Sequence, residues 1–185
     1  MIIPSNSDKF NPEWLELISH DPVHPSVPKE IRVQGNRKVL MYEENDQEQC
    51  LICTKISDDL VRSMKDIFND GVEGGVTAMF YTIFRLPDAL FGVGQRALFE
   101  AVNHFSERGV KNFYTLSPVP SLRRHFDQQP TEEQVREYIL TKKDPVARFH
   151  LGNGATLHAV NFDADPSDLR QEESWGIMVN YRYST

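Results

Sequence analysis

A histidine and a serine, each next to an apolar run, are the residues of this chain with the clearest chemical potential. His150 lies in R-F-H-L-G-N-G and is followed by a glycine turn, and Ser117 ends the apolar strand F-Y-T-L before Pro118. An imidazole and a hydroxyl brought together over one small substrate could move a proton and orient an anionic group. Taken alone, His150 is equally consistent with a structural role, and a serine at the end of a strand usually has one. Ser117 lies outside a G-x-S-x-G sequence, which disfavours an esterase-like triad.

Two cysteines and a group of aspartates suggest other chemistries, but both have a simpler interpretation. Cys50 and Cys53 form C-L-I-C inside an apolar run that is typical of a buried strand. Residues three apart on a strand point to opposite faces, so the pattern favours core cysteines over a redox pair. The segment F-D-A-D-P-S-D, with Asp163, Asp165 and Asp168, lacks the further ligands of a metal site. It is predicted to be a polar turn, and no metal is expected.

The segment F-G-V-G-Q-R-A suggests a binding site for an anion. Gly92 and Gly94 would let the backbone approach a ligand closely, and a helix predicted to begin at Gln95 would present its N-terminus to a diphosphate. Arg96 could add positive charge. The sequence is neither a P-loop nor a dinucleotide fingerprint, and two glycines before a helix are more often a simple turn.

Acidic residues outnumber basic ones and argue against some partners. The 185 residues carry a formal net charge of -7, which disfavours binding to a phosphate backbone. No apolar run approaches the roughly 18 residues of a membrane-spanning helix. The first residues show no targeting pattern, and two cysteines suit a reducing compartment. The sequence therefore predicts a cytoplasmic protein with no nucleic-acid partner and no membrane partner.

Alternating strand and helix patterns predict an α/β fold with one mixed sheet flanked by helices. Residues 1–36, rich in proline, are predicted to be an N-terminal extension packing on the core, and residues 37–185 the catalytic domain. One helix is expected after an N-cap at Ser57, and T-E-E-Q predicts a capping box at Thr131. Strands are predicted at 37–42, 50–56, 76–84, 112–116, 155–162 and 175–183, and further helices at 12–19, 95–108, 121–126 and 131–140.

These segments together resemble the catalytic domain of the malonyl-CoA decarboxylase family, which has the acetyltransferase-like (GNAT) fold. The resemblance covers most of the chain from about residue 20. It implies a short form without the family's N-terminal helical domain, and Gly94 stands where the family carries a glutamate. It is carried by C-L-I-C-T-K-I-S-D-D-L, V-T-A-M-F-Y-T-I-F, the G-V at Gly92, T-L-S-P-V-P at Ser117, F-H-L-G-N-G-A at His150 and G-I-M-V-N-Y-R-Y at the end.

The resemblance implies a role for each matching residue. Ser117 and His150 match the family's catalytic serine and histidine, and Tyr183 matches a tyrosine of the same site. Asn180 and Tyr181 of N-Y-R-Y are expected to contact the substrate. The segment expected to hold the diphosphate of coenzyme A (CoA) consists of Gly92, Val93, Gly94, Gln95, Arg96 and Ala97.

The activity that the resemblance implies is decarboxylation of malonyl-CoA, or a close malonyl thioester, to acetyl-CoA and CO2. Ser117 would orient the carboxylate, and His150 would protonate the enolate or first donate to the carboxylate. No metal or redox cofactor is expected beyond the CoA that the substrate carries. The expected partner is malonyl-CoA or a malonyl carrier-protein thioester, with a homo-oligomer possible. Two alternatives are a GNAT-type acyltransferase acting on an acyl-CoA or carrier-protein thioester, and a non-catalytic acyl-CoA-binding protein.

Overall fold

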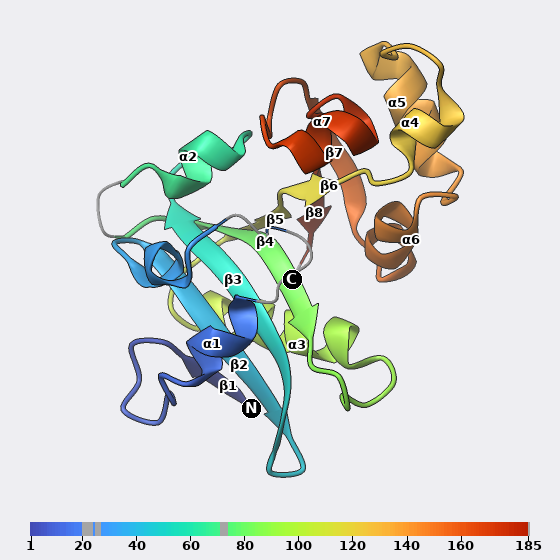
Figure 1. Ribbon diagram of the computed structural model, residues 1–185. Helices are drawn as coiled ribbons and strands as arrows, with labels where there is room; N and C mark the ends of the chain where they lie inside the picture. The colour runs from blue at the N-terminus through green and yellow to red at the C-terminus, as the bar shows by residue number, and fades with distance from the viewer. Residues whose placement is uncertain (20–23, 25–26, 71–73, 185) are drawn as a thin grey trace. The chain divides into compact units, whose positions relative to one another are not determined.

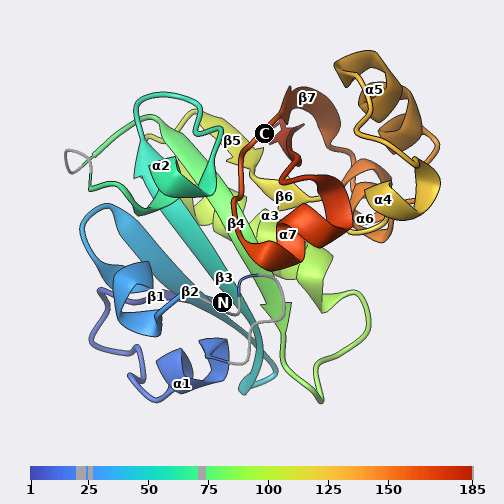
Figure 2. The ribbon, with the colours of Figure 1, turned by 45° about the horizontal axis from the view of Figure 1, so that its top comes forward.

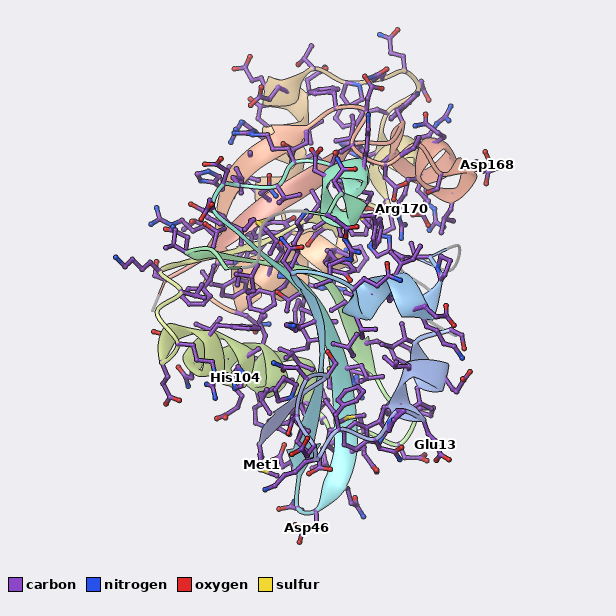
Figure 3. The ribbon with its side chains drawn as sticks, turned by 90° about the vertical axis from the view of Figure 1, so that its left-hand side faces the viewer. Met1, Glu13, Asp46, His104, Asp168 and Arg170 are labelled. Carbon is purple, nitrogen blue, oxygen red and sulfur yellow. The ribbon has the colours of Figure 1, made fainter. Side chains whose placement is uncertain are left out.

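Two adjoining polar residues turn the chain back on itself between two long paired strands. In the computed structural model, which describes residues 1–19, 24, 27–70 and 74–184, strands β2 (Arg37–Glu44) and β3 (Gln47–Ser57) form an antiparallel hairpin. Asn45 and Asp46 form its turn with φ of 56° and 58°, a backbone conformation that Asn and Asp tolerate better than most residues. Figure 3 shows Asp46 at the tip. The predicted hairpin is confirmed, and both strands are longer than expected.

This hairpin belongs to the first of two compact units, which comprises residues 1–59 and 70–113. Its sheet has the order β1 (Ile2–Pro4), β2, β3 and β4 (Thr77–Arg85), with each strand antiparallel to the next. Helix α3 (Val93–Ser106) packs against this sheet, on the opposite face from α1 (Trp14–Ile18) in Figures 1 and 2. The 3-10 helix η1 (Lys29–Val33) contacts β2. The face of α3 that is buried includes Ala97, Leu98, Ala101, Val102 and Phe105.

The second unit comprises residues 60–69 and 114–184 and is built around β8 (Met178–Tyr183). Strands β6 (Ser117–Pro118) and β7 (Thr156–Asn161) pair antiparallel with β8. Helices α5 (Glu132–Leu140) and α6 (Pro145–Gly152) contact β7, as Figure 2 shows. The other elements are α2 (Met64–Phe68), α4 (Leu122–His125), α7 (Asp168–Ser174) and the end of β5 (Asn112–Thr115), a strand in which the chain passes from the first unit to the second.

Several predicted boundaries are wrong for local reasons. Ser57 is the last residue of β3, and the helix that follows begins at Met64, where Ser63 Oγ accepts the backbone N–H of Asp66. Helix α3 begins at Val93, two residues before the predicted start. Asp168 begins α7 instead of lying in a polar turn. Strand β1 and helix α6 were not predicted.

The predicted extension, residues 1–36, contributes directly to the first unit where it is described. Strand β1 adds to the sheet edge, and the buried Trp14 packs edge-on against Phe10 at 5.1 Å. Residues 20–23 and 25–26 of this extension lie outside the described residues. Residues 37–185 are divided between the two units.

Three further findings bear on the expected chemistry. Cys50 and Cys53 are both buried, as predicted, and are not joined in a disulfide, and burial raises the pKa of the Cys50 thiol to about 12. Within the described parts of the chain, no group of three or more His, Cys, Asp or Glu side chains is arranged to hold a metal ion. The same residues include no helix long and apolar enough to cross a membrane.

Candidate active site

Helix α6 places His150 in its last turn. The helix starts at Pro145, which has the backbone angle and the missing N–H that suit a first helical position. Asp144 is the N-cap, and its Oδ1 accepts the backbone N–H groups of Val146 at 2.9 Å and Ala147 at 3.0 Å. The side chain of His150 therefore extends from a helix whose start is fixed by a carboxylate.

The same carboxylate ties this helix to the segment that follows Ser117. Asp144 is fully buried, and its Oδ2 accepts both the backbone N–H of Ser121, at 3.2 Å, and the Ser121 hydroxyl. Ser121 lies four residues after Ser117. One buried carboxylate thus holds together the two segments that carry the predicted catalytic pair.

Strand β8 supplies the two tyrosines that contact His150. Its Val179 pairs with Ser117 of β6. Alternate residues of a strand share a face, so Tyr181 and Tyr183 point the same way as Val179. Both tyrosines contact His150: the Tyr181 ring stacks on the imidazole with centroids 4.7 Å apart, and Tyr183 Oη lies 2.9 Å from Nδ1.

The predicted catalytic pair is in direct contact. Ser117 Oγ lies 3.1 Å from His150 Nε2, although 33 positions separate the two residues in sequence. The Ser117 hydroxyl donates to Thr115 Oγ1 at 2.9 Å. Ser117 and His150 are only 5% and 4% exposed, so the pair is almost completely shielded from bulk water.

Burial keeps His150, Tyr181 and Tyr183 uncharged near neutral pH. It lowers the pKa of His150 from 6.5 to about 3, because the imidazolium would lose its hydration. Burial is also the main cause of the raised pKa values of Tyr181 and Tyr183. For Tyr181, the negative charge of Asp144 adds to the effect. The site is therefore a neutral hydrogen-bonded chain, not an ion pair.

Asn180 and Tyr181 have different surroundings from each other. Asn180 Nδ2 donates to the backbone oxygens of Val61 at 3.1 Å and Thr115 at 2.8 Å, and its Oδ1 accepts from Asn161 at 2.8 Å. Both amide hydrogens are thus used within the fold. The Tyr181 hydroxyl is buried and has no hydrogen-bond partner within the described part of the chain. Their predicted contact with substrate stays a prediction.

Thr115, Asp144 and Asn161 were missed by the sequence analysis. Asp144 had a usable signal, because an Asp directly before a Pro is a typical start of a helix. Thr115 stands two residues before Ser117, the spacing that puts two strand residues on one face. Nothing in the local sequence indicates the role of Asn161.

The predicted CoA segment belongs to the first unit, at the N-terminus of α3. Gly92 is the N-cap and has a φ of 72°, which glycine adopts without steric cost. Arg96 Nε donates to Glu44 at 2.9 Å, and Arg96 Nη1 donates to the backbone oxygen of Phe91 at 3.0 Å. The Arg96 charge is therefore shared with a carboxylate, while the guanidinium braces the turn at Gly92.

The C-terminal part of the chain is similar in sequence to known proteins. Residues 131–185 match the family model of the malonyl-CoA decarboxylase C-terminal domain. The mitochondrial malonyl-CoA decarboxylase of the rat, Rattus norvegicus, is 49% identical over 51 residues, which are 28% of this chain and 10% of the rat protein. This part of the chain is thus similar to the C-terminal domain of malonyl-CoA decarboxylases. The predicted resemblance is confirmed, and the matched region includes His150 and Tyr183 but not Ser117.

Solved structures extend the likeness to the whole chain at the level of the fold. Malonyl-CoA decarboxylase from Agrobacterium vitis has a TM-score of 0.79 and 24% identity, covering 100% of this chain and 60% of its own. The GNAT-like decarboxylase GphF, solved with isobutyryl-CoA, has a TM-score of 0.71 and 16% identity, covering 100% of this chain and 98% of its own. The predicted GNAT-like α/β fold is confirmed. This chain thus spans three-fifths of the A. vitis enzyme and matches a tenth of the rat protein.

Proposed function

We propose that this protein decarboxylates malonyl-CoA, or a close malonyl thioester, to acetyl-CoA and CO2. The observation that carries the proposal is the buried hydrogen bond between Ser117 and His150, within 3.1 Å, beside a tyrosine of the region that matches the family. In the reaction the bond between the methylene carbon and the carboxylate breaks, and its electron pair passes to the thioester as an enolate. One proton then adds to carbon, and the thioester bond stays intact.

The N-terminus of α3 would hold the diphosphate of CoA. The helix has 14 residues, so its N-terminal end carries the partial positive charge of the helix dipole. Gly92, Val93, Gly94, Gln95, Arg96 and Ala97 form its cap and first turns. Because Arg96 already pairs with Glu44, its main contribution would be to brace the Gly92 turn.

Ser117 would orient the substrate carboxylate. Its hydroxyl donates to Thr115 in the free protein and can turn to a carboxylate oxygen when substrate binds. A carboxylate held with its carbon–carbon bond perpendicular to the thioester plane is aligned for loss of CO2. A neutral donor suits this role, because a full positive charge would stabilise the charged substrate more than the transition state.

His150 would deliver the proton to the enolate carbon. Since burial holds its pKa at about 3, the donor at neutral pH is the N–H of a neutral imidazole. The carbon of a thioester enolate is a stronger base than the imidazolate that would be left behind, so this transfer is downhill. As Nε2 gives up its proton, Tyr183 can pass one to Nδ1, 2.9 Å from its oxygen, and water later restores the phenol.

Product analysis tests the proposal. The chain is incubated with malonyl-CoA and with methylmalonyl-CoA, with and without an acyl acceptor, and products are identified by mass spectrometry. Acetyl-CoA and CO2 formed from malonyl-CoA without an acceptor support decarboxylation. Transfer to an added amine or carrier thiol would support the acyltransferase alternative, and tight CoA binding without turnover the non-catalytic one.

Two variants and two matched controls assign the residues. His150→Ala and Ser117→Ala should each lose roughly 10²- to 10⁴-fold in acetyl-CoA formation. His125→Ala and Ser106→Ala remove the same side chains from exposed helical positions and should keep activity. Full activity in either of the first two would refute the assignment.

The carrier-protein substrate, the homo-oligomer and the cytoplasmic location stay predictions.

A further inference from the structure

Buried hydrogen bonds connect Tyr183, His150, Ser117 and Thr115, and the direction of the last bond determines the directions of the others. The Ser117 hydroxyl donates to Thr115 Oγ1 at 2.9 Å, and Thr115 is only 1% exposed. Thr115 Oγ1 also accepts the backbone N–H of Tyr181, at 3.3 Å. Two elements of the unit, β6 and β8, therefore direct a hydrogen at the same threonine oxygen.

A serine hydroxyl has a single proton, so Ser117 cannot donate to Thr115 and to His150 at once. Its oxygen must then accept from His150 Nε2, which lies 3.1 Å away. A neutral imidazole has one N–H, so a protonated Nε2 leaves Nδ1 as an acceptor. The atom 2.9 Å from Nδ1 is the Tyr183 hydroxyl oxygen, which can supply the remaining proton.

We propose that Thr115 is a positioning residue that sets the proton direction from Tyr183 through His150 to Ser117, so that His150 carries its proton on Nε2. The consequence for catalysis, which rests on the proposed function, is that His150 presents an N–H on the side where Ser117 meets the substrate. The opposite direction would place a bare Nε2 beside the Ser117 hydroxyl. That is the arrangement of a serine nucleophile activated by a base. Thr115 thus favours proton donation over covalent attack on the thioester.

The tautomer of His150 can be read in the free protein. The full chain is labelled with 15N-histidine, and the imidazole nitrogens are recorded by NMR at pH 7 without any ligand. The resonances of His150 are assigned by their loss in His150→Gln. We expect a protonated Nε2 and an unprotonated Nδ1, and a protonated Nδ1 in the unaltered protein would overturn the proposal.

Three variants separate positioning from general support of the fold. Thr115→Val keeps the shape but removes the acceptor, and we expect the His150 proton to shift toward Nδ1. Thr115→Ser restores a hydroxyl and should restore protonated Nε2. Tyr183→Phe should keep protonated Nε2, because Ser117 still accepts from it. An unchanged tautomer in folded Thr115→Val, or a reversed one in Tyr183→Phe, would contradict the proposal.

Thr115→Val also leaves the Tyr181 N–H without its acceptor, so circular dichroism must first show that it folds. If it does not fold, the tautomers of the unaltered protein and of Tyr183→Phe decide the matter. With malonyl-CoA, Thr115→Val should lower kcat roughly tenfold with little change in KM, the effect of one misdirected hydrogen bond, and Thr115→Ser should restore it. Equal loss in both variants would indicate support of the fold alone. Because the tautomer is measured without substrate, it can fail or succeed independently of the decarboxylase activity.

Discussion

Lowering the pH from 7 to 5 should destabilise the second unit by about 2 kcal/mol through His150 alone. Its pKa is about 3 in the folded protein and 6.5 in the unfolded chain, so between these values the unfolded state binds the extra proton. Stability is therefore complete above pH 6.5 and falls as the pH decreases toward 3. One pKa unit corresponds to about 1.4 kcal/mol, and pH 5 lies about 1.5 units below the unfolded value. The full loss by pH 3 would be about 5 kcal/mol.

The two tryptophans allow the two units to be followed separately. Trp14 belongs to the first unit and Trp175 to the second, where the Arg123 guanidinium lies 4.7 Å from its ring centroid. In a Trp14→Phe background, urea unfolding followed by fluorescence reports on the unit that contains His150. Adding His150→Gln provides the control, since other groups titrate too. For example, burial and nearby arginines also lower the pKa of His158.

The difference between these two proteins should itself change by about 2 kcal/mol between pH 7 and pH 5. An equal pH effect on both proteins would refute the argument that His150 is held neutral by burial. A larger pH effect in the His150→Gln protein would mean that the contribution of His150 to stability has the opposite sign to the one expected.

Three further predictions follow from other parts of the structure. Asp144→Ala removes the acceptor of four hydrogen bonds and should lower the free energy of unfolding by about 3 kcal/mol. Thr131→Ala, at the more exposed cap of α5, should lower it by only about 1 kcal/mol, and equal losses in urea unfolding would contradict this. For decarboxylation of malonyl-CoA, kcat/KM should not change between pH 5 and pH 8, because His150 is neutral throughout. A tenfold fall in kcat/KM for each unit by which the pH is raised would show that the imidazolium is required. Gly92→Ala places a Cβ 3.2 Å from Arg96 Nη1 and strains a backbone with φ of 72°, so KM for malonyl-CoA should rise several-fold while kcat changes by no more than about twofold. An unchanged KM would show that this turn does not bind CoA.

Elements stabilised by their own residues were predictable from the sequence. The β2–β3 hairpin has a polar turn between apolar strands, and α5 has a complete capping box at Thr131. Helix α6 was missed although Asp144 and Pro145 are a typical helix start, because it has only eight residues and its N-cap carboxylate is held by Ser121, 23 positions earlier. Strand β1, with three residues, depends on pairing with β2. Such short elements form through contacts that local patterns do not contain.

The residues of the site also depend on contacts that the local sequence does not show. Ser117, His150 and Tyr183 were found through the family resemblance, since nothing in their spacing of 33 residues between neighbours indicates contact. Their meeting depends on β6 pairing with β8 and on Asp144 fixing α6. The neutral state of His150 was also beyond the sequence, because it results from burial by several elements.

A neutral histidine fits decarboxylation better than an imidazolium would, and the energies decide this. Protonating His150 at pH 7 against a pKa of about 3 costs about 5.5 kcal/mol. A neighbouring carboxylate raises the pKa of a histidine by about 1–3 units, which returns only about 1.4–4 kcal/mol of that cost. This carboxylate is also the group that the reaction destroys, so any stabilisation that it gives to the imidazolium is lost as CO2 departs. Proton delivery from the neutral Nε2–H, with Tyr183 supplying Nδ1, avoids this loss because no charge on His150 has to be created before the carbon–carbon bond breaks.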